Sequence, residues 1–106
     1  MDNGEKKSLL FRIGLGRRAG KLIVGTEMVC DGVRDGKVLL IIMAENASPN
    51  SRKRILGCAK YYNAEVDTVD VTTEELGAAI GKSAVACVGV TDENIVRLIN
   101  SRQKKQ

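Results

Sequence analysis

The stretch GLGRRAGKLIVG at residues 14–25 combines glycines with three cations and is the part of the chain best suited to bind phosphate. A nucleotide-binding loop of the form Gly, four residues, Gly-Lys-Ser/Thr would need a glycine at position 15 and a hydroxyl at position 22, where the chain has Leu15 and Leu22. The dinucleotide fingerprint also fails, because the third glycine comes one residue late and no apolar strand precedes the stretch. What remains is a glycine-rich, cationic turn without a nucleotide motif.

Acid–base and nucleophilic chemistry has little support elsewhere in the chain. There is no histidine, which removes the usual general base and the commonest zinc ligand. Carboxylate pairs at 74–75 and 92–93 fall in the predicted first turns of helices, where negative charge complements the helix dipole. Cys30, Cys58 and Cys87 are odd in number and widely spaced, which argues against a disulfide framework or a structural zinc site. We therefore expect three buried or half-buried thiols, and no enzyme, metal site or cofactor.

Positive charge is concentrated in the first half of the chain. Residues 1–60 hold 12 Lys and Arg against 6 Asp and Glu, a net charge of +6, whereas residues 61–106 hold 5 against 7, a net charge of −2. Lysine and arginine gain from Coulomb attraction and counterion release near phosphates, so this asymmetry favours a face that binds a polyanion. A basic surface that is simply solvated remains the alternative at this point.

The length of 106 residues suits a single compact domain. We expect a flexible N-terminus at 1–7, one domain at 8–100 and a frayed basic tail at 101–106. The longest apolar run, 38–44, is far shorter than a membrane span, and no signal-peptide pattern opens the chain. The sequence therefore predicts a cytoplasmic protein. It also predicts a monomer, because it contains no heptad pattern of the kind that forms coiled coils.

Helical and strand-like segments alternate along the chain. Local signals support several of them: Gly16 and Gly20 as possible helix stops, Ser48 as an N-cap before a proline, and a capping box from Thr72 to Glu75. The expected helices are 8–20, 26–36, 49–62, 72–81 and 91–100, and the expected strands are 21–24, 37–44, 66–71 and 84–90. In the helix at 49–62, the helical periodicity predicts that the side chains facing the core are those of Ile55, Leu56, Ala59 and Tyr62. This pattern predicts a three-layer α/β/α sandwich with a mixed sheet of about four strands and about five helices.

Four segments, taken in order, resemble the kink-turn RNA-binding family that includes ribosomal proteins L7Ae and L30e, and in particular its short bacterial, YlxQ-like members. They are RAGKLIVGTEMV, VLLIIMAENASPN, CAKYYNAEV and ELGAAIGK, and the resemblance covers about residues 8–98. It implies the same α/β/α sandwich. It also implies structured RNA as the partner, which is a kink-turn whose sheared G·A pairs receive the N-terminus of a helix in a widened major groove. Ribosomal RNA is one candidate for that partner.

The resemblance assigns RNA contacts to three groups of residues. At the base edges it places Gly25, Thr26 and Glu27, where the helix N-terminus offers backbone N–H groups. Near phosphates we expect Arg17, Arg18, Lys21, Lys37 and Lys82. Over the flipped-out loop nucleotide the resemblance places Ser83, Ala84 and Val85, together with Lys82. Without the resemblance, residues 82–85 would be interpreted as an ordinary helix-to-strand connection, and the basic run NSRKR at 50–54 as a solvated helix face.

The helix after Gly25 departs from the archaeal pattern of Asn, Glu and, three residues later, Lys. The chain has instead Glu27, Met28 and Asp31. An ionised Glu27 accepts hydrogen bonds but cannot donate to guanine O6, and Asp31 repels a phosphate that lysine would attract. Bacterial members commonly carry Glu at the position of Glu27. Two hypotheses therefore stay open: a non-enzymatic protein that recognises kink-turn RNA, and a ribosome-associated interaction module of the same fold with only non-specific RNA affinity.

Overall fold

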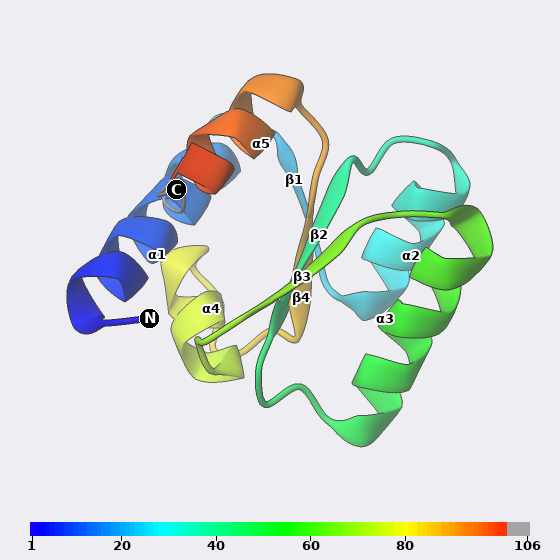
Figure 1. Ribbon diagram of the computed structural model, residues 1–106, viewed down its shortest axis with the longest axis horizontal. Coiled ribbons are helices and arrows are strands. Elements are labelled where there is room, and N and C mark those ends of the chain that lie inside the picture. The colour runs from blue at the N-terminus through cyan, green and yellow to red at the C-terminus, as the bar shows by residue number, and fades with distance from the viewer. Residues whose placement is uncertain (102–106) are drawn as a thin grey trace.

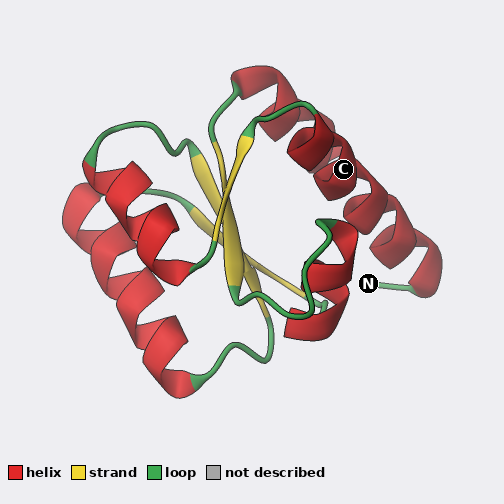
Figure 2. Cartoon of the chain, turned by 180° about the vertical axis from the view of Figure 1, so that it is seen from behind, coloured by secondary structure: helices red, strands yellow, loops and turns green. Residues whose placement is uncertain are grey.

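The computed structural model describes residues 1–101 and arranges them as a four-stranded sheet between two layers of helices (Figures 1 and 2). The helices are α1 (Asn3–Arg18), α2 (Thr26–Arg34), α3 (Pro49–Tyr62), α4 (Thr73–Ala79) and α5 (Glu93–Asn100). The strands are β1 (Leu22–Val24), β2 (Leu40–Ala44), β3 (Val66–Val69) and β4 (Cys87–Val90). The predicted α/β/α sandwich is confirmed.

The sheet has the order β1-β4-β2-β3 and is mixed. Strand β4 pairs antiparallel with both β1 and β2, and β2 pairs parallel with β3. All five residues of β2 are buried, as expected for an apolar strand with no alternation. Its side chains point to opposite faces in turn, so Leu40 and Ile42 join one core cluster while Ile41 and Met43 join the other.

The two faces of the sheet carry different helices. Helices α1, α4 and α5 cover one face, and α2 and α3 cover the other (Figure 1). The larger core lies under α1, α4 and α5 and is centred on fully buried residues such as Leu9, Ile13 and Leu76. The second core lies under α2 and α3 around Val29 and Ile55. No helix of the described residues has the length and apolar character that crossing a membrane requires.

Helix α1 starts five residues earlier than the sequence pattern predicted. Asp2 accepts a hydrogen bond from the backbone N–H of Glu5, and the Glu5 side chain accepts one from the backbone of Asp2, which completes a capping box. Residues 3–7 therefore form the first turns of α1, where a flexible N-terminus was expected. The frayed tail predicted at 101–106 lies, apart from Ser101, outside the described residues.

The glycines expected to end the first helix have different roles. Gly14 and Gly16 lie inside α1 and are buried. Helix α1 continues to Arg18, so the prediction of a stop at Gly16 was wrong. Both glycines instead allow close helix packing. A Cβ at Gly14 would come within 3.1 Å of a backbone oxygen of α4, and one at Gly16 within 3.0 Å of Ile95 on α5. The chain turns instead at Gly20, whose φ of +74° lies in the left-handed region that glycine adopts without strain.

The inward face of α3 was predicted only in part. Ile55 and Ala59 are buried as expected, but Leu56 and Tyr62 are 42% and 43% exposed. The third buried side chain of α3 is Cys58. Successive side chains of a helix point in directions about 100° apart, so only positions three and four apart share the narrow face that packs against α2. Leu56 follows Ile55 by one residue and therefore points away from that face.

We predict that Gly77→Ala destabilises the protein, whereas Gly57→Ala does not. A Cβ at Gly77 would lie 2.7 Å from backbone atoms of Ala84, so α4 or the loop before β4 must shift, at a cost of about 1–3 kcal/mol. A Cβ at Gly57 meets nothing within 4 Å, and alanine is the better helix former by about 0.5–1 kcal/mol. Urea unfolding of both variants measures the difference, and equal stabilities would contradict the close packing of α4 on this loop.

Candidate nucleic-acid interface

One end of the sheet gathers three segments that lie far apart in the sequence. The backbone N–H of Gly25, just before α2, donates to the carbonyl of Cys87 at 3.2 Å, and that of Ala44, at the end of β2, donates to the carbonyl of Ala86 at 2.9 Å. The N-termini of α2 and α3 and the loop that enters β4 therefore meet at this end, which we call the α2 end of the sheet (Figure 1). The antiparallel pairing of β4 with both β1 and β2 forces this arrangement.

The N-terminus of α2 has no side-chain cap. Its N-cap residue is Gly25, at φ +95° and ψ 153°, whereas a side chain caps each of the other four helices of the described chain. A Cβ at Gly25 would meet nothing within 4 Å, so glycine is required here by backbone conformation and not by crowding. The N–H groups of the first turn, and the positive end of the helix dipole, are left for another acceptor.

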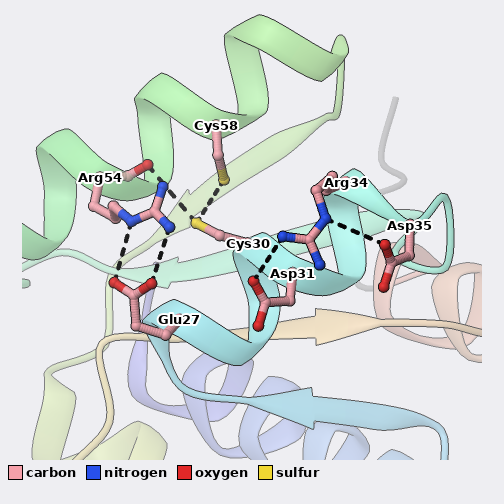
Figure 3. A network of polar contacts seen from close by, with 7 residues as sticks. All are labelled: Glu27, Cys30, Asp31, Arg34, Asp35, Arg54 and Cys58. Carbon is pink, nitrogen blue, oxygen red and sulfur yellow. Dashed lines mark hydrogen bonds and ion pairs between the residues drawn. The ribbon is translucent and has the colours of Figure 1, made fainter.

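Glu27 in this first turn forms a two-point ion pair with Arg54 of α3 (Figure 3). Nε of Arg54 donates to Oε2 at 3.1 Å and Nη2 donates to Oε1 at 2.9 Å. These hydrogen bonds, followed by the positive charge of Arg54, hold the pKa of Glu27 below its ordinary value of 4.5. The Glu27 side chain is 71% exposed, so the fork lies on the surface, and the carboxylate that the sequence presented as an isolated negative charge is neutralised.

Asp31 also has an arginine neighbour on its own helix, which it shares with Asp35. Nη1 of Arg34 lies 3.3 Å from Oδ1 of Asp31, and Nε of Arg34 lies 3.3 Å from Oδ1 of Asp35 (Figure 3). The hydrogen bond and charge of Asp35, with a smaller contribution from Asp31, raise the pKa of Arg34. Both acidic departures from the archaeal pattern therefore have an arginine partner, and the repulsion expected between Asp31 and a phosphate is weakened.

The surface beside α2 is shaped by the first turns of α3. One shallow depression is lined by Thr26, Glu27, Asn50, Ser51 and Arg54, and it adjoins a second that is lined by Asn50, Lys53, Arg54, Gly57 and Cys58. The basic run NSRKR was assigned to a solvated face, and four of its five residues, Asn50, Ser51, Lys53 and Arg54, line these two depressions. The basic run is visible in the sequence, but only the packing of α3 on α2 brings it close to Gly25.

The loop before β4 supplies three exposed residues and one buried residue. Lys82, Ser83 and Ala84 are exposed at the α2 end. Val85 is only 9% exposed and packs into the core beneath α1, α4 and α5, while its N–H donates to the carbonyl of Thr73 at 3.0 Å. The expectation that Val85 lies over a nucleotide is therefore corrected, because a side chain committed to the core offers almost no surface.

Four of the cations predicted to contact phosphate lie at the opposite end of the sheet. Arg17 and Arg18 end α1, Lys21 precedes β1, and Lys37 follows the turn after α2. The carbonyl of Lys21 accepts a hydrogen bond from the N–H of Thr91, which follows β4, and Nζ of Lys21 lies 3.8 Å from Oδ2 of Asp92. The length of β1, about 13 Å from position 21 to position 25, separates this group from the α2 end. The expectation that these four cations lie beside the first turn of α2 is therefore not met in the structure.

The three cysteines are free and buried. Burial raises the pKa of Cys30 to about 12, with a further contribution from its contact with Cys58, and burial also raises the pKa of Cys87 to about 12. A hydrogen bond from Thr26 opposes part of the shift at Cys87. Cys30 and Cys87 therefore stay protonated at neutral pH and provide no thiolate nucleophile. Within residues 1–101, no group of three or more His, Cys, Asp or Glu side chains is placed to hold a metal.

We predict that Arg54→Met raises the pKa of Glu27 toward its ordinary value. The folded-state pKa of Glu27 is depressed, so the ion pair stabilises the fold above pH 4.5 and this contribution disappears as the pH falls through the depressed value. Carbon-detected NMR titration of the Glu27 carboxyl measures the shift, and Arg54→Lys should give an intermediate value. The matched control is Arg52→Met, because Arg52 donates to the carbonyl of Glu45 and not to Glu27. A Glu27 midpoint that is the same with and without Arg54 would contradict the pairing.

Comparison with known proteins places the chain in a family. Residues 7–99 match the model of the ribosomal protein L7Ae/L30e/S12e/Gadd45 family. The RNA-binding protein YlxQ of Bacillus subtilis is 32% identical over 89 residues, which cover 84% of this chain and 88% of the relative. The large ribosomal subunit protein eL30 of Sulfurisphaera tokodaii is 31% identical over 83 residues, which cover 77% and 78%.

Solved structures share the fold. A Bacillus halodurans protein, described as of unknown function, has a TM-score of 0.79 at 32% identity and covers 89% of this chain and 94% of its own. The Giardia lamblia 15.5kD RNA binding protein has a TM-score of 0.75 at 16% identity, covering 96% and 87%, which is a likeness of fold. With the family match extending over nearly all of the described residues, the chain belongs to the ribosomal protein L7Ae/L30e/S12e/Gadd45 family.

Proposed function

We propose that this protein binds structured RNA through the α2 end of its sheet and has no enzymatic activity. Curated relatives at 31–36% identity are named as RNA-binding or ribosomal proteins. The supporting physical features are a helix N-terminus that no side chain caps and the exposed cations Lys53 and Lys82 beside it. Both features favour a polyanionic partner.

The Glu27–Arg54 fork is the observation that carries this proposal. Asparagine at position 27 would both donate to and accept from a base edge, whereas Glu27 alone can only accept. Nε and Nη2 of Arg54 already donate to that carboxylate, but a guanidinium carries five N–H donors, and its remaining N–H groups can donate to O6 and N7 of guanine. The two side chains together thus offer the donor and acceptor set of an asparagine in a bacterial version of the motif.

We further propose that the preferred RNA is a kink-turn or a similarly bent internal loop with tandem G·A pairs. Gly25, Thr26 and the fork face the base edges in this arrangement, and Ser83 and Ala84 cover the loop nucleotide with small side chains. Lys82 and Lys53 border the same surface and contact the backbone. The protein stabilises the kinked state because it binds that state more tightly than the extended one.

Arg17, Arg18, Lys21 and Lys37 keep a proposed role as outlying phosphate contacts. They reach RNA only where a duplex continues from the α2 end along the sheet, so their contribution depends on the length of the flanking helix. Because such contacts are electrostatic, they strengthen binding to any RNA sequence and weaken as salt is added.

We propose that the protein acts as a cytoplasmic monomer. The sequence contains no heptad pattern that would call for a partner helix, and the excess of positive charge resists self-association. Sedimentation of the purified chain at increasing concentration tests this part of the proposal, which a concentration-dependent dimer would overturn.

Binding to a kink-turn duplex tests the proposed specificity. The control duplex carries Watson–Crick pairs in place of the tandem G·A pairs, and both are titrated at near-physiological salt. We expect the kink-turn to bind at least about tenfold more tightly. Equal, weak and strongly salt-dependent binding to both duplexes would reject kink-turn recognition and favour the alternative, a ribosome-associated interaction module with only non-specific RNA affinity.

Substitutions at the two ends of the sheet locate the RNA surface. We expect Arg54→Ala to weaken kink-turn binding by about tenfold to a hundredfold, because it removes base-edge donors and leaves Glu27 as an unpaired negative charge. Lys82→Ala should lower the salt slope by about one. The matched control is Arg17→Ala, which should have little effect on a duplex that ends near the kink. A larger loss from Arg17→Ala than from Arg54→Ala would place the RNA at the other end.

A further inference from the structure

Two of the three cysteines are in contact across the seam between α2 and α3 (Figure 3). Sγ of Cys58 lies 2.6 Å from Sγ of Cys30, although the two residues are 28 positions apart in the chain. Neither helix is interrupted at these positions, and the two helices pack along one seam. The paired sulfur atoms are therefore held together by the fold and not by local sequence.

Each of the two sulfur atoms also lies near a backbone carbonyl of α3. The thiol of Cys58 donates to the sulfur of Cys30, and its Sγ also lies 3.4 Å from the carbonyl oxygen of Ile55. Cys30 in turn donates to the carbonyl oxygen of Arg54 at 3.8 Å.

Cys58 is the more exposed thiol of the pair. Cys58 is 8% exposed and lines the depression that Lys53, Arg54 and Gly57 also border. Gly57 places no side chain over it, and a Cβ there would meet nothing within 4 Å. Cys30 is 3% exposed, and burial raises its pKa to about 12. A small oxidant therefore meets Cys58 first.

We propose that Cys30 and Cys58 are a redox modification site, in which a hydroperoxide converts the two thiols into a reversible disulfide that links α2 to α3. The sulfur of Cys58 attacks one oxygen of hydrogen peroxide, the O–O bond breaks, and water leaves with the thiol proton, which gives a sulfenic acid. The sulfur of Cys30 then attacks the Cys58 sulfur, the S–O bond breaks, and a second water leaves with the proton of Cys30. Two thiols and one peroxide thus give one disulfide and two waters.

The cross-link would lie one helical turn beyond the Glu27–Arg54 fork on each helix. Cys30 follows Glu27 by three residues and Cys58 follows Arg54 by four, so the bond would fix the spacing of α2 and α3 directly beneath the surface that carries the fork. It would also close a loop between positions 28 residues apart, which restricts the unfolded chain and stabilises the fold. This inference concerns the thiols alone and stands whether or not the protein binds a kink-turn.

Intact-mass and peptide analysis of the oxidised protein tests the pair. The full chain, reduced and freed of reductant, is treated with hydrogen peroxide and measured without reduction. We expect the mass to fall by two hydrogen atoms, one cross-linked peptide pair to contain Cys30 and Cys58, and dithiothreitol to restore the mass. The melting temperature of the oxidised protein should rise by several degrees. A protein that keeps three free thiols, or only gains oxygen atoms without a cross-link, would overturn the proposal.

The three single Cys→Ser variants separate this pair from general oxidation. Cys30→Ser and Cys58→Ser should lose both the cross-link and the rise in melting temperature, whereas the matched control Cys87→Ser should keep both. Cys87 lies on β4 and is fully buried. Cross-linking that depends on Cys87, or that joins two chains, would contradict the assignment, and the measurement on the unmodified sequence decides the matter if a serine variant does not fold.

Discussion

The antiparallel pairing of β4 with both β1 and β2 is the constraint on which the rest of this structure depends. It makes β1 and β2 run in the same direction, so the segments that follow them, Gly25 with α2 and the loop before α3, leave the sheet at one end. The segment that precedes β4 arrives at that same end. Both faces of β2 and β4 are buried under helices, so a one-residue slip in register would exchange side chains between two closely packed cores and is disfavoured.

The α2–α3 layer concentrates the chemistry of this molecule. Glu27 and Arg54 pair at its surface, and Cys30 and Cys58 touch one helical turn beyond them. The surface pair is charged and exposed, so it stabilises the fold little and is open to exchange its partners for those of a ligand. The thiol pair is buried in an apolar seam, where its reactivity is low until an oxidant enters from the side of Gly57.

Departures from a family motif need to be considered together with their spatial neighbours. Met28 remains an unexplained apolar residue, 60% exposed in the first turn of α2. Glu27 and Asp31, in contrast, each gain an arginine, one from another helix and one from the next turn. The net negative charge of this surface is therefore smaller than the acidic residues of the first two turns of α2 alone indicate.

The sequence by itself determined the elements and their class. Ser48 with Pro49 and Thr72 with Glu75 mark helix starts by local hydrogen bonding, and the unbroken apolar run of β2 marks a strand buried on both faces, so these predictions were confirmed. Local patterns predicted a stop at Gly16 and an inward Leu56, and both were wrong, because close helix packing decides such positions. Only the tertiary structure decided which cations lie beside Gly25, that Val85 is buried, and that Glu27 meets Arg54 and Cys30 meets Cys58. These are contacts between residues far apart in the chain, and sheet order and helix packing fix them, whereas sequence periodicity reports only what each element does within itself.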